Sequence, residues 1–418
     1  MKPVIAAFVL LSSLAALADE TGRLEVLFLG DDGHHKPGAR FFQALPALHP
    51  KGINLTYTDK LSDINPANLA KYDALAIFAN WPKITPQAEK AMIDFVQGGK
   101  GLVPIHCASF CFQNSAEYIR IVGGQFKSHG TGDFDTAIVS PNHPIMRGIE
   151  PFTTWDETYV HDKHNAEGRT VLQERDKEPW TWVRNEGKGR VFYTAYGHDE
   201  RTWSKPGFHD LLARGIVWSV GDAAAARFQK WDAKPLTYDA NKEVPNYEKR
   251  TPAPQYQNPL SPEESRKRIY KPVDMDLALM ASEVDAAKLK NVIEFQWDER
   301  GRMWVIETVD YPNEIARPED IAAGKNGNDR IRILEDSDGD GKFDKSTVFA
   351  DKLSCPTSLC FMNGGVIVIQ APHTLFLRDS NGDDKADETK ILFTGWGSGD
   401  THAVASNIKL GLDGWIYG

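Results

Sequence analysis

One short apolar run constrains the fold of the first half of this chain more than any other feature. It follows a pair of glycines and precedes a group of reactive side chains. Leu102–Ile105 has the length and the β-branched content of a buried strand. The preceding Gly98–Gly99 pair ends a helix, and His106, Cys107 and Ser109 follow the run. Since ligands bind beyond the carboxyl ends of strands in an open α/β sheet, this stretch predicts a functional sheet edge. A His and an inert buried Cys that only cap a strand would give the same pattern.

Apolar runs and helical periodicities alternate along the rest of this half. Further strands are expected over residues 24–29, 55–57 and 72–79, and helices over residues 39–48 and from Thr85 to the glycine pair. Residues 180–183 and 189–194 have the pattern of a late antiparallel pair, and a closing amphipathic helix is expected over residues 208–220. This alternation predicts an α/β domain with a parallel sheet and helices on both of its faces.

The amino terminus has the pattern of an export signal. Lys2 precedes an apolar run over Val4–Leu14, and the small-residue segment ending at Ala18 predicts cleavage there. An uncleaved membrane anchor is the alternative, but the run is short for a bilayer span. We therefore expect a protein that works outside the cytoplasm, in the periplasm or associated with a membrane.

Charge and cysteine content narrow the function classes. The 418 residues carry a net charge of -10 without a concentrated basic face, so nucleic acid is not an expected partner. The four cysteines are Cys107, Cys111, Cys355 and Cys360; an exported protein can form disulfides, but proximity in the sequence leaves their pairing open. The sequence has no Cys-x-x-Cys-His motif for covalent haem.

Histidines at predicted strand ends indicate a shared polar pocket. Ten of the twelve histidines precede residue 222, and the expected pocket contains His34, His35, His106, His129 and His198. Neutral imidazole is a common metal ligand, so such a pocket could hold an ion. However, no His-x-x-x-His helix marks a metal site, and each of these histidines could also be structural.

Several motifs in this half resemble the ThuA-like (trehalose-utilisation) family. The similarity covers about Arg23 to Gly221 and lies in Gly33-His34-His35, the run ending in His106-Cys107-Ala108, Gly123-Gly124 with Phe126 and His129, Asn142-His143-Pro144-Ile145, Asp156-Glu157 with Tyr159, and Gly187 to Tyr193 with Gly197-His198-Asp199. The resemblance implies the fold of class I glutamine amidotransferases, a flavodoxin-like sheet, and a sugar or keto-sugar ligand. The substrate-binding residues are then expected to be His34, His35, His129, Tyr159 and Asp199.

One departure from the amidotransferase pattern bears on mechanism. In those enzymes the strand after the glycines ends in a nucleophilic Cys on a sharp turn. Here His106 takes that position and Cys107 follows one residue later. Because a shift of one residue changes the direction of a side chain, a Cys–His–Glu triad is not expected. Nucleophilic catalysis by the Cys107 thiol stays open as an alternative.

The remaining motif residues suggest acid–base chemistry. His106 is expected to act as a general acid or base, or as a ligand, with a carboxylate partner from Asp156 or Glu157. His198 with Asp199 would form a second proton-handling pair.

A proline-rich stretch separates two parts of the chain. Residues 223–270 predict an extended, semi-rigid linker. We therefore expect a signal peptide over residues 1–18, the ThuA-like domain over 19–222, this linker, and a second domain over 271–418.

Two similar acidic loops mark the second domain, after a hairpin signal at Asp298–Gly301. They begin at Asp336 and Asp379, 43 residues apart, which is close to the length of a propeller blade. Oxygen ligands at loop positions 1, 3, 5 and 9 suit a hard cation such as calcium, and a solvated acidic turn is the alternative. The expected ligands are Asp336, Asp338, Asp340 and Asp344 in the first loop and Asp379, Asn381, Asp383 and Asp387 in the second.

This part resembles the membrane-bound-dehydrogenase propellers of planctomycete-type bacteria, relatives of glucose/sorbosone dehydrogenases. The matching segments are Trp297 to Val305, Asp310-Tyr311-Pro312, both acidic loops, Gly399 to His402 and Gly411 to Tyr417. The resemblance implies oxidation of a sugar or alcohol, with His402 as the one candidate site residue. Since the sequence reaches only about two blades by Gly418, we expect an incomplete all-β propeller that a further segment or a partner chain completes. A quinone cofactor is expected only in the completed propeller.

The leading hypothesis is an exported carbohydrate-processing protein. Its ThuA-like domain would act on a sugar, keto-sugar or glycoside by His/carboxylate acid–base chemistry, beside a calcium-stabilised, truncated dehydrogenase-like propeller. Two alternatives remain: a non-catalytic sugar-binding or assembly module, which the displaced Cys favours, and a metal-dependent hydrolase.

Overall fold

The computed structural model describes residues 22–240, 249–285, 287–311, 327–397, 399–400 and 402–418. The chain forms two compact units, Met1–Asp276 and Leu277–Gly418, which are considered separately. The predicted export signal lies outside the described residues. None of the described helices is both long enough and apolar enough to cross a membrane.

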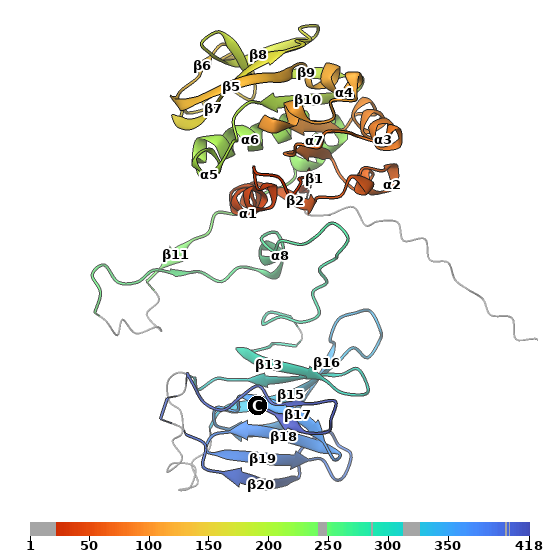
Figure 1. Ribbon diagram of the computed structural model, residues 1–418. Coiled ribbons are helices and arrows are strands. Elements are labelled where there is room, and N and C mark those ends of the chain that lie inside the picture. Colours follow the sequence, from red (N-terminus) through yellow and green to blue (C-terminus); the bar gives the residue numbers. More distant parts are fainter. Residues whose placement is uncertain (1–21, 241–248, 286, 312–326, 398, 401) are drawn as a thin grey trace, which may run out of the picture. The chain divides into compact units, whose positions relative to one another are not determined.

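An eight-stranded sheet forms the centre of the first unit, with the strand order β2-β1-β3-β4-β10-β9-β8-β6 (Figure 1). β2, β1, β3, β4 and β10 pair in parallel, whereas β9 and β8 are antiparallel. The bounds are β1 Leu24–Leu29, β2 Ile53–Thr58, β3 Ala74–Ile77, β4 Gly101–Pro104, β6 Ala137–Ile138, β8 Arg169–Arg175, β9 Glu178–Glu186 and β10 Gly189–Thr194. The predicted α/β fold with a parallel sheet and a late antiparallel pair is confirmed.

Helices pack against this sheet, and α3 begins at the capping residue that the sequence indicates. The Thr85 hydroxyl caps α3 by accepting a hydrogen bond from the Ala88 backbone N–H at 3.2 Å, and Pro86 occupies the first turn. The helices are α1 Pro37–Leu48, α2 Pro66–Leu69, α3 Pro86–Gln97, α4 Ala116–Val122, α5 Glu200–Trp203, α6 Pro206–Ser219 and α7 Asp222–Phe228, with short 3-10 turns η1 His49–Lys51, η2 Leu61–Asp63 and η3 His106–Phe110. The predicted helices correspond to α1, α3 and α6.

A long antiparallel pair lies outside the main sheet and has no counterpart in the sequence-based expectations. It joins β5 (Gln125–Phe134) to β7 (Thr154–Asp162). His129 on β5 is directly opposite Tyr159 on β7. This pair brings residues of two separate motifs to the carboxyl edge of the parallel strands.

The end of the proline-rich stretch packs against the sheet of the first unit. The Tyr270 hydroxyl donates to the Leu55 carbonyl oxygen at 2.7 Å, and the Asn54 side-chain amide donates to the Lys271 carbonyl oxygen at 2.9 Å. These contacts cover the β2 side of the sheet, where β2 is the edge strand. The stretch includes β11 Tyr238–Asp239, β12 Tyr256–Gln257 and α8 Pro262–Arg266.

The second unit is mostly β-structure. It contains two four-stranded antiparallel sheets, each connected in sequence order, and a short two-stranded pair. Within its described residues the sheets form no closed barrel or propeller. The predicted hairpin at Gly301 is confirmed, with φ of 77° at that glycine. The strands are β13 Val292–Trp297, β14 Met303–Glu307, β15 Asp329–Glu335, β16 Lys345–Leu353, β17 Ser358–Met362, β18 Gly365–Gln370, β19 His373–Arg378, β20 Glu388–Thr394, β21 Lys409–Leu410 and β22 Ile416–Tyr417.

Close packing at the start of β10 gives the first prediction. A Cβ atom at Gly189 would overlap the carbonyl oxygens of Val96 and Lys100, which are backbone atoms and cannot rotate away. We expect Gly189→Ala to lower the free energy of unfolding by ~2–3 kcal/mol, since the overlap forces the strand away from the end of α3.

Gly132→Ala is the matched control, because a Cβ atom there meets nothing within 4 Å. Urea denaturation of both variants compares the two positions. Equal stability of the two variants would contradict the packing of β10 described above.

Candidate functional site

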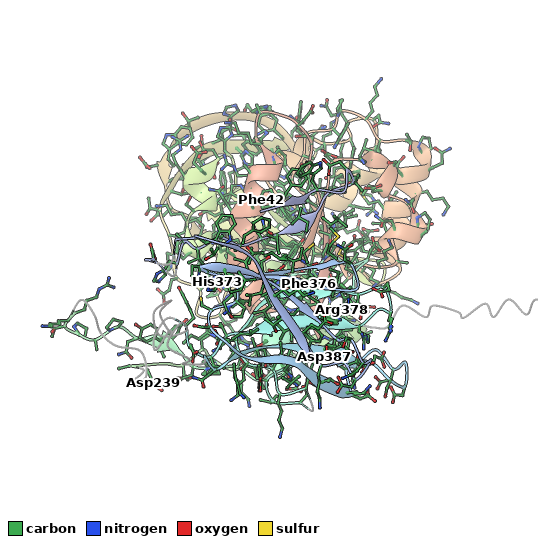
Figure 2. All side chains as sticks on the ribbon, turned by 90° about the horizontal axis from the view of Figure 1, so that it is seen from below. Phe42, Asp239, His373, Phe376, Arg378 and Asp387 are labelled. Carbon is green, nitrogen blue, oxygen red and sulfur yellow. The ribbon has the colours of Figure 1, made fainter. Side chains whose placement is uncertain are left out.

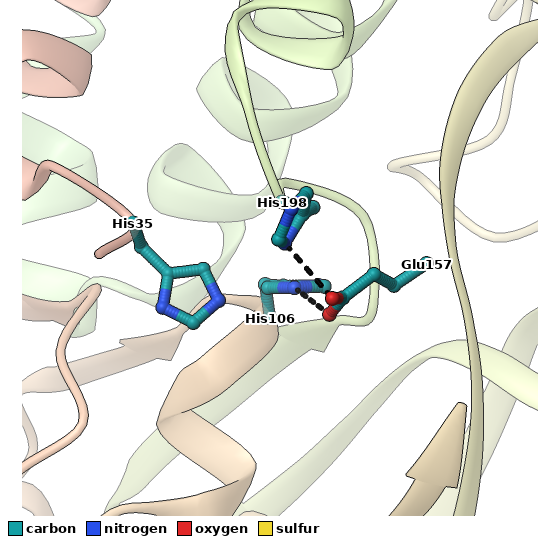
Figure 3. Close-up of side chains that lie close together, drawn as sticks. All are labelled: His35, His106, Glu157 and His198. Atoms are coloured by element: carbon teal, nitrogen blue, oxygen red, sulfur yellow. Dashed lines mark hydrogen bonds and ion pairs between the residues drawn. The ribbon is translucent and has the colours of Figure 1, made fainter. Parts of the chain in front are cut away.

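Four side chains from four separate segments meet at the carboxyl edge of the parallel strands. His35 follows β1, His106 follows β4, Glu157 lies on β7, and His198 follows β10. One ligand atom from each residue lies within 4.8 Å of the corresponding atoms of the other three. Figure 3 shows the Glu157 carboxylate directed at both His106 and His198, with His35 beside His106. We refer to these four residues as the imidazole–carboxylate cluster.

His106 has a strained backbone and a fixed ring. Its φ is 49°, in the left-handed region that non-glycine residues rarely adopt. The ring is fully buried, and its Nδ1 lies 2.7 Å from the Ala195 carbonyl oxygen. Since a carbonyl oxygen only accepts hydrogen bonds, Nδ1 must carry the proton and donate it. The other ring nitrogen, Nε2, therefore faces the Oε2 atom of Glu157, 3.2 Å away.

Glu157 is shared by two imidazoles. Its Oε2 is 3.2 Å from His106 Nε2, and its Oε1 is 3.2 Å from His198 Nδ1. Burial by itself would raise the pKa of Glu157, but the interactions with both imidazoles outweigh it and hold the pKa well below its usual range. The same carboxylate raises the pKa of His198. Glu157 is thus ionised in this arrangement.

His35 is buried beside the two other imidazoles. Its ring centroid is 5.4 Å from that of His106 and 5.3 Å from that of His198. Burial and the neighbouring imidazoles lower the pKa of His35 to about 2, so the ring is neutral. Its Nε2 is buried without a hydrogen-bond partner among the described residues. His198 Nδ1 is also buried and, apart from its ion pair with Glu157, has no hydrogen-bond partner among the described residues, so the cluster holds two such ring nitrogens.

Asp156 differs from Glu157 in role, because neighbouring residues of a strand point to opposite faces. The buried carboxylate accepts hydrogen bonds from the backbone N–H groups of Gly197 at 2.8 Å and His198 at 3.1 Å, and from the Thr202 hydroxyl at 2.6 Å. It also accepts from the Glu157 N–H at 2.8 Å. With its lone pairs used in this way, Asp156 holds the loop that carries His198.

The other predicted pocket residues lie around this cluster at different depths. His129 is 39% exposed, with Nε2 3.5 Å from Glu157 Oε1, and the exposed His34 ring lies 3.9 Å from that of His35. Tyr159 is buried and stacks on His106 at 4.1 Å. Asp199 instead caps α5 and pairs with Arg201. All five predicted pocket histidines therefore fall in one neighbourhood.

The cysteines are free thiols. Cys107 is completely buried, and burial raises the pKa of its thiol well above the usual range. The thiolate that a nucleophilic mechanism requires is disfavoured at this position.

A second buried network lies behind His106 and was not anticipated. His161 contacts the Glu178 carboxylate at 3.1 Å and the Tyr193 hydroxyl at 2.9 Å. Tyr193 in turn donates to Ser109 at 3.0 Å. Glu157, Tyr159 and His161 share one face of β7, so the alternation along this strand could have indicated the network if β7 had been recognised.

The two acidic loops of the second unit share one hydrogen-bond pattern. Ser337 donates to Asp344 in the first loop, and Ser380 donates to Asp387 in the second, through both the backbone N–H and the hydroxyl. Asp336 and Asp379 each accept from the N–H groups of their own loop.

The loops differ in their carboxylate content. The carboxylates of Asp336, Asp338 and Asp340 lie within 4.8 Å of one another. In the second loop, Asn381 takes the place equivalent to Asp338. Figure 2 shows Asp387, at the end of this loop, together with His373, Phe376 and Arg378 of the preceding β19.

Comparison with known proteins agrees with this description of the first unit. The first unit is an α/β domain with a cluster of polar side chains at the sheet edge where such folds bind ligands. Residues 25–219 match the family described as trehalose utilisation, ThuA. The N-terminal part of the chain is therefore a ThuA-like domain, which at the family level points to a carbohydrate-related function. Residues 261–418 match a family described as a domain of unknown function, DUF7133.

Among solved structures, a ThuA-like protein from Parabacteroides merdae is 16% identical, with a TM-score of 0.42 over 47% of this chain and 90% of that chain. A ThuA-like protein from Bacteroides uniformis is also 16% identical, with a TM-score of 0.42 over 47% of this chain and 91% of that chain. No curated protein matches the chain.

The contacts of Asp156 give the second prediction. Gly197 and His198 donate to different oxygens of Asp156, so Asp156→Asn places its NH2 group against one of these two N–H donors, and it removes the negative charge from both bonds. We expect the free energy of unfolding to fall by ~2 kcal/mol. Thermal or urea unfolding of the first unit measures this change.

Asp199→Asn is the matched control, since Asn caps a helix about as well as Asp. It should leave stability within ~0.5 kcal/mol of the parent. A stable Asp156→Asn variant would show that the carboxylate does not hold the His198 loop.

Proposed function

We propose that the ThuA-like domain acts on a sugar or keto-sugar by acid–base chemistry at the imidazole–carboxylate cluster. The observation that carries the proposal is the position of Glu157, with one carboxylate oxygen 3.2 Å from His106 and the other 3.2 Å from His198. This arrangement lies at the sheet edge where α/β folds bind ligands. The family match to trehalose utilisation supports the choice of substrate class.

Sugars react through hydroxyl and carbonyl oxygens, and reactions at these groups require proton transfer. A carboxylate between two imidazoles can accept and return protons over short distances. His129 and His34 are exposed beside the buried cluster, so they are suited to contact an incoming sugar. In this proposal Asp156 is a positioning residue, and the buried Cys107 thiol has no catalytic role.

We further propose that the protein is exported and that its second unit is related to dehydrogenase propellers. The export proposal is based on the residue pattern over 1–18. For the second unit, two successive four-stranded meanders support the comparison, because each propeller blade is a four-stranded antiparallel sheet. Further blades from another segment or chain would complete the ring, and sugar oxidation with a quinone is proposed only for that complete form.

Calcium is the proposed ion of the acidic loops. The three clustered carboxylates of Asp336, Asp338 and Asp340 support the first loop as the stronger site. The second loop would bind more weakly, because Asn381 supplies a neutral oxygen in place of a carboxylate.

Removal of the His106 ring tests the catalytic proposal. The substrate is whichever disaccharide, or keto form of a disaccharide, the protein converts. We expect His106→Ala to reduce its turnover by about 10²–10⁴-fold, because the imidazole contacts the carboxylate that transfers the proton. His143→Ala is the control: this histidine lies in the same domain, against Trp218, and should leave turnover unchanged.

Two outcomes would contradict the proposal. Unchanged turnover in His106→Ala would exclude this cluster as the catalytic site. Sugar binding by the parent protein, without conversion of any compound in a panel of glycosides and keto-glycosides, would identify a binding module instead.

Calcium titration tests the acidic loops. We expect saturating Ca2+ to raise the melting temperature of the second unit by ~5 °C, because an ion that binds only the folded state stabilises it. Asp336→Asn should remove most of this shift, whereas Asp351→Asn, on the exposed part of β16, should retain it. Scanning calorimetry with calcium and with a chelator measures both, and an unshifted parent protein would exclude the site.

A further inference from the structure

We propose that the imidazole–carboxylate cluster binds a divalent first-row transition-metal ion through His35, His106, Glu157 and His198. All four residues lie in the part of the chain that the structure describes, and one ligand atom from each lies within 4.8 Å of the others. In a tetrahedral site with bonds of about 2.1 Å, two ligand atoms are separated by about 3.4 Å. The His106 Nε2–Glu157 Oε2 and His198 Nδ1–Glu157 Oε1 contacts, both 3.2 Å, are close to this spacing, and each uses a different oxygen of the carboxylate.

The unsatisfied atom of His35 is the second, independent observation. His35 is 6% exposed, and its Nε2 has no hydrogen-bond partner among the described residues. A buried polar atom without a partner is costly unless an unplaced group satisfies it. An ion among the four residues supplies that partner to His35.

The tautomer of His106 leads to the same conclusion. Because Nδ1 donates to the Ala195 carbonyl oxygen, the Nε2 of a neutral ring presents a lone pair to the Glu157 carboxylate. Two lone pairs at 3.2 Å repel each other unless a cation lies between them. A proton or a metal ion can fill this role, and a metal ion among the four residues would in addition give His35 Nε2 a partner.

The surroundings of these residues resemble those of known metal ligands. Metal-binding histidines usually donate their second ring N–H to a carbonyl or carboxylate, as His106 does to Ala195. The loop of His198 is held by Asp156, which does not belong to the cluster. Two of the four ligands, His106 and His198, are therefore held in place by contacts that do not involve an ion.

The ligand types select the class of metal. Three imidazoles and one carboxylate suit Zn2+, Fe2+ or a similar ion, whereas Ca2+ and Mg2+ prefer oxygen ligands. Because the four residues fill a tetrahedral shell, a bound ion would polarise a sugar carbonyl or hydroxyl through a fifth coordination position. The metal proposal rests on the proposed function and reassigns the roles at the same site: with an ion bound, His106, Glu157 and His198 would serve as ligands instead of moving the proton, and the exposed His129 would be the nearest free imidazole for proton transfer.

Metal content and cobalt binding test the proposal without any sugar. The full chain is purified without a polyhistidine tag, its metal content is measured by mass spectrometry, and the chelated protein is titrated with Co2+ while its visible absorption is recorded. We expect about one equivalent of Co2+ with a spectrum of nitrogen coordination. His35→Ala and Glu157→Gln should each weaken binding at least ~10-fold.

His34→Ala is the matched control, since this neighbouring imidazole is exposed and lies outside the cluster. It should bind Co2+ like the parent. Circular dichroism checks that the variants are folded. If His35→Ala does not fold, Glu157→Gln, which preserves the size of the side chain, still tests the site. A metal-free parent that takes up no Co2+, or equal binding by the parent and a folded Glu157→Gln variant, would overturn the metal site. Neither result depends on turnover, so the sugar proposal would still be tested separately by His106→Ala.

Discussion

The hydrogen bond from His106 Nδ1 to the Ala195 carbonyl oxygen is the interaction on which the arrangement of the site depends. It joins the ends of β4 and β10, two neighbouring parallel strands that are also linked through Ile105 and Thr194. The bond sets both the orientation of the ring and the position of its proton. Together with the stacking of Tyr159 on the ring, it directs Nε2 toward Glu157.

The sheet topology explains why histidines from distant parts of the sequence meet here. In a parallel sheet every carboxyl end lies at one edge, so the residues that follow β1, β4 and β10 become neighbours. The sequence patterns were sufficient to predict this for His35, His106 and His198. Apolar runs bounded by glycine indicated the strands, and the Thr85-Pro86 pair indicated the start of α3.

The carboxylate side of the site was less predictable. Asp156 and Glu157 are adjacent in the sequence, and only the strand β7 determines which of them points toward His106. That strand is paired with β5 outside the main sheet, and its buried face carries the polar side chains of Glu157 and His161, so its sequence gives no clear apolar alternation. A local pattern therefore could not separate the residue that faces the imidazoles from the one that holds a loop. The Ala195 carbonyl is a backbone atom and leaves no signal in the sequence.

The left-handed backbone of His106 has a consequence for variation at this position. A conformation that costs about 1–3 kcal/mol in an ordinary residue costs almost nothing in glycine and little in asparagine. Exchange of the imidazole for either of these would relax the turn while removing the ring. The same exchange would also empty a fully buried space and leave the Ala195 carbonyl oxygen without its donor, so relief of backbone strain and loss of the ring change the stability in opposite directions.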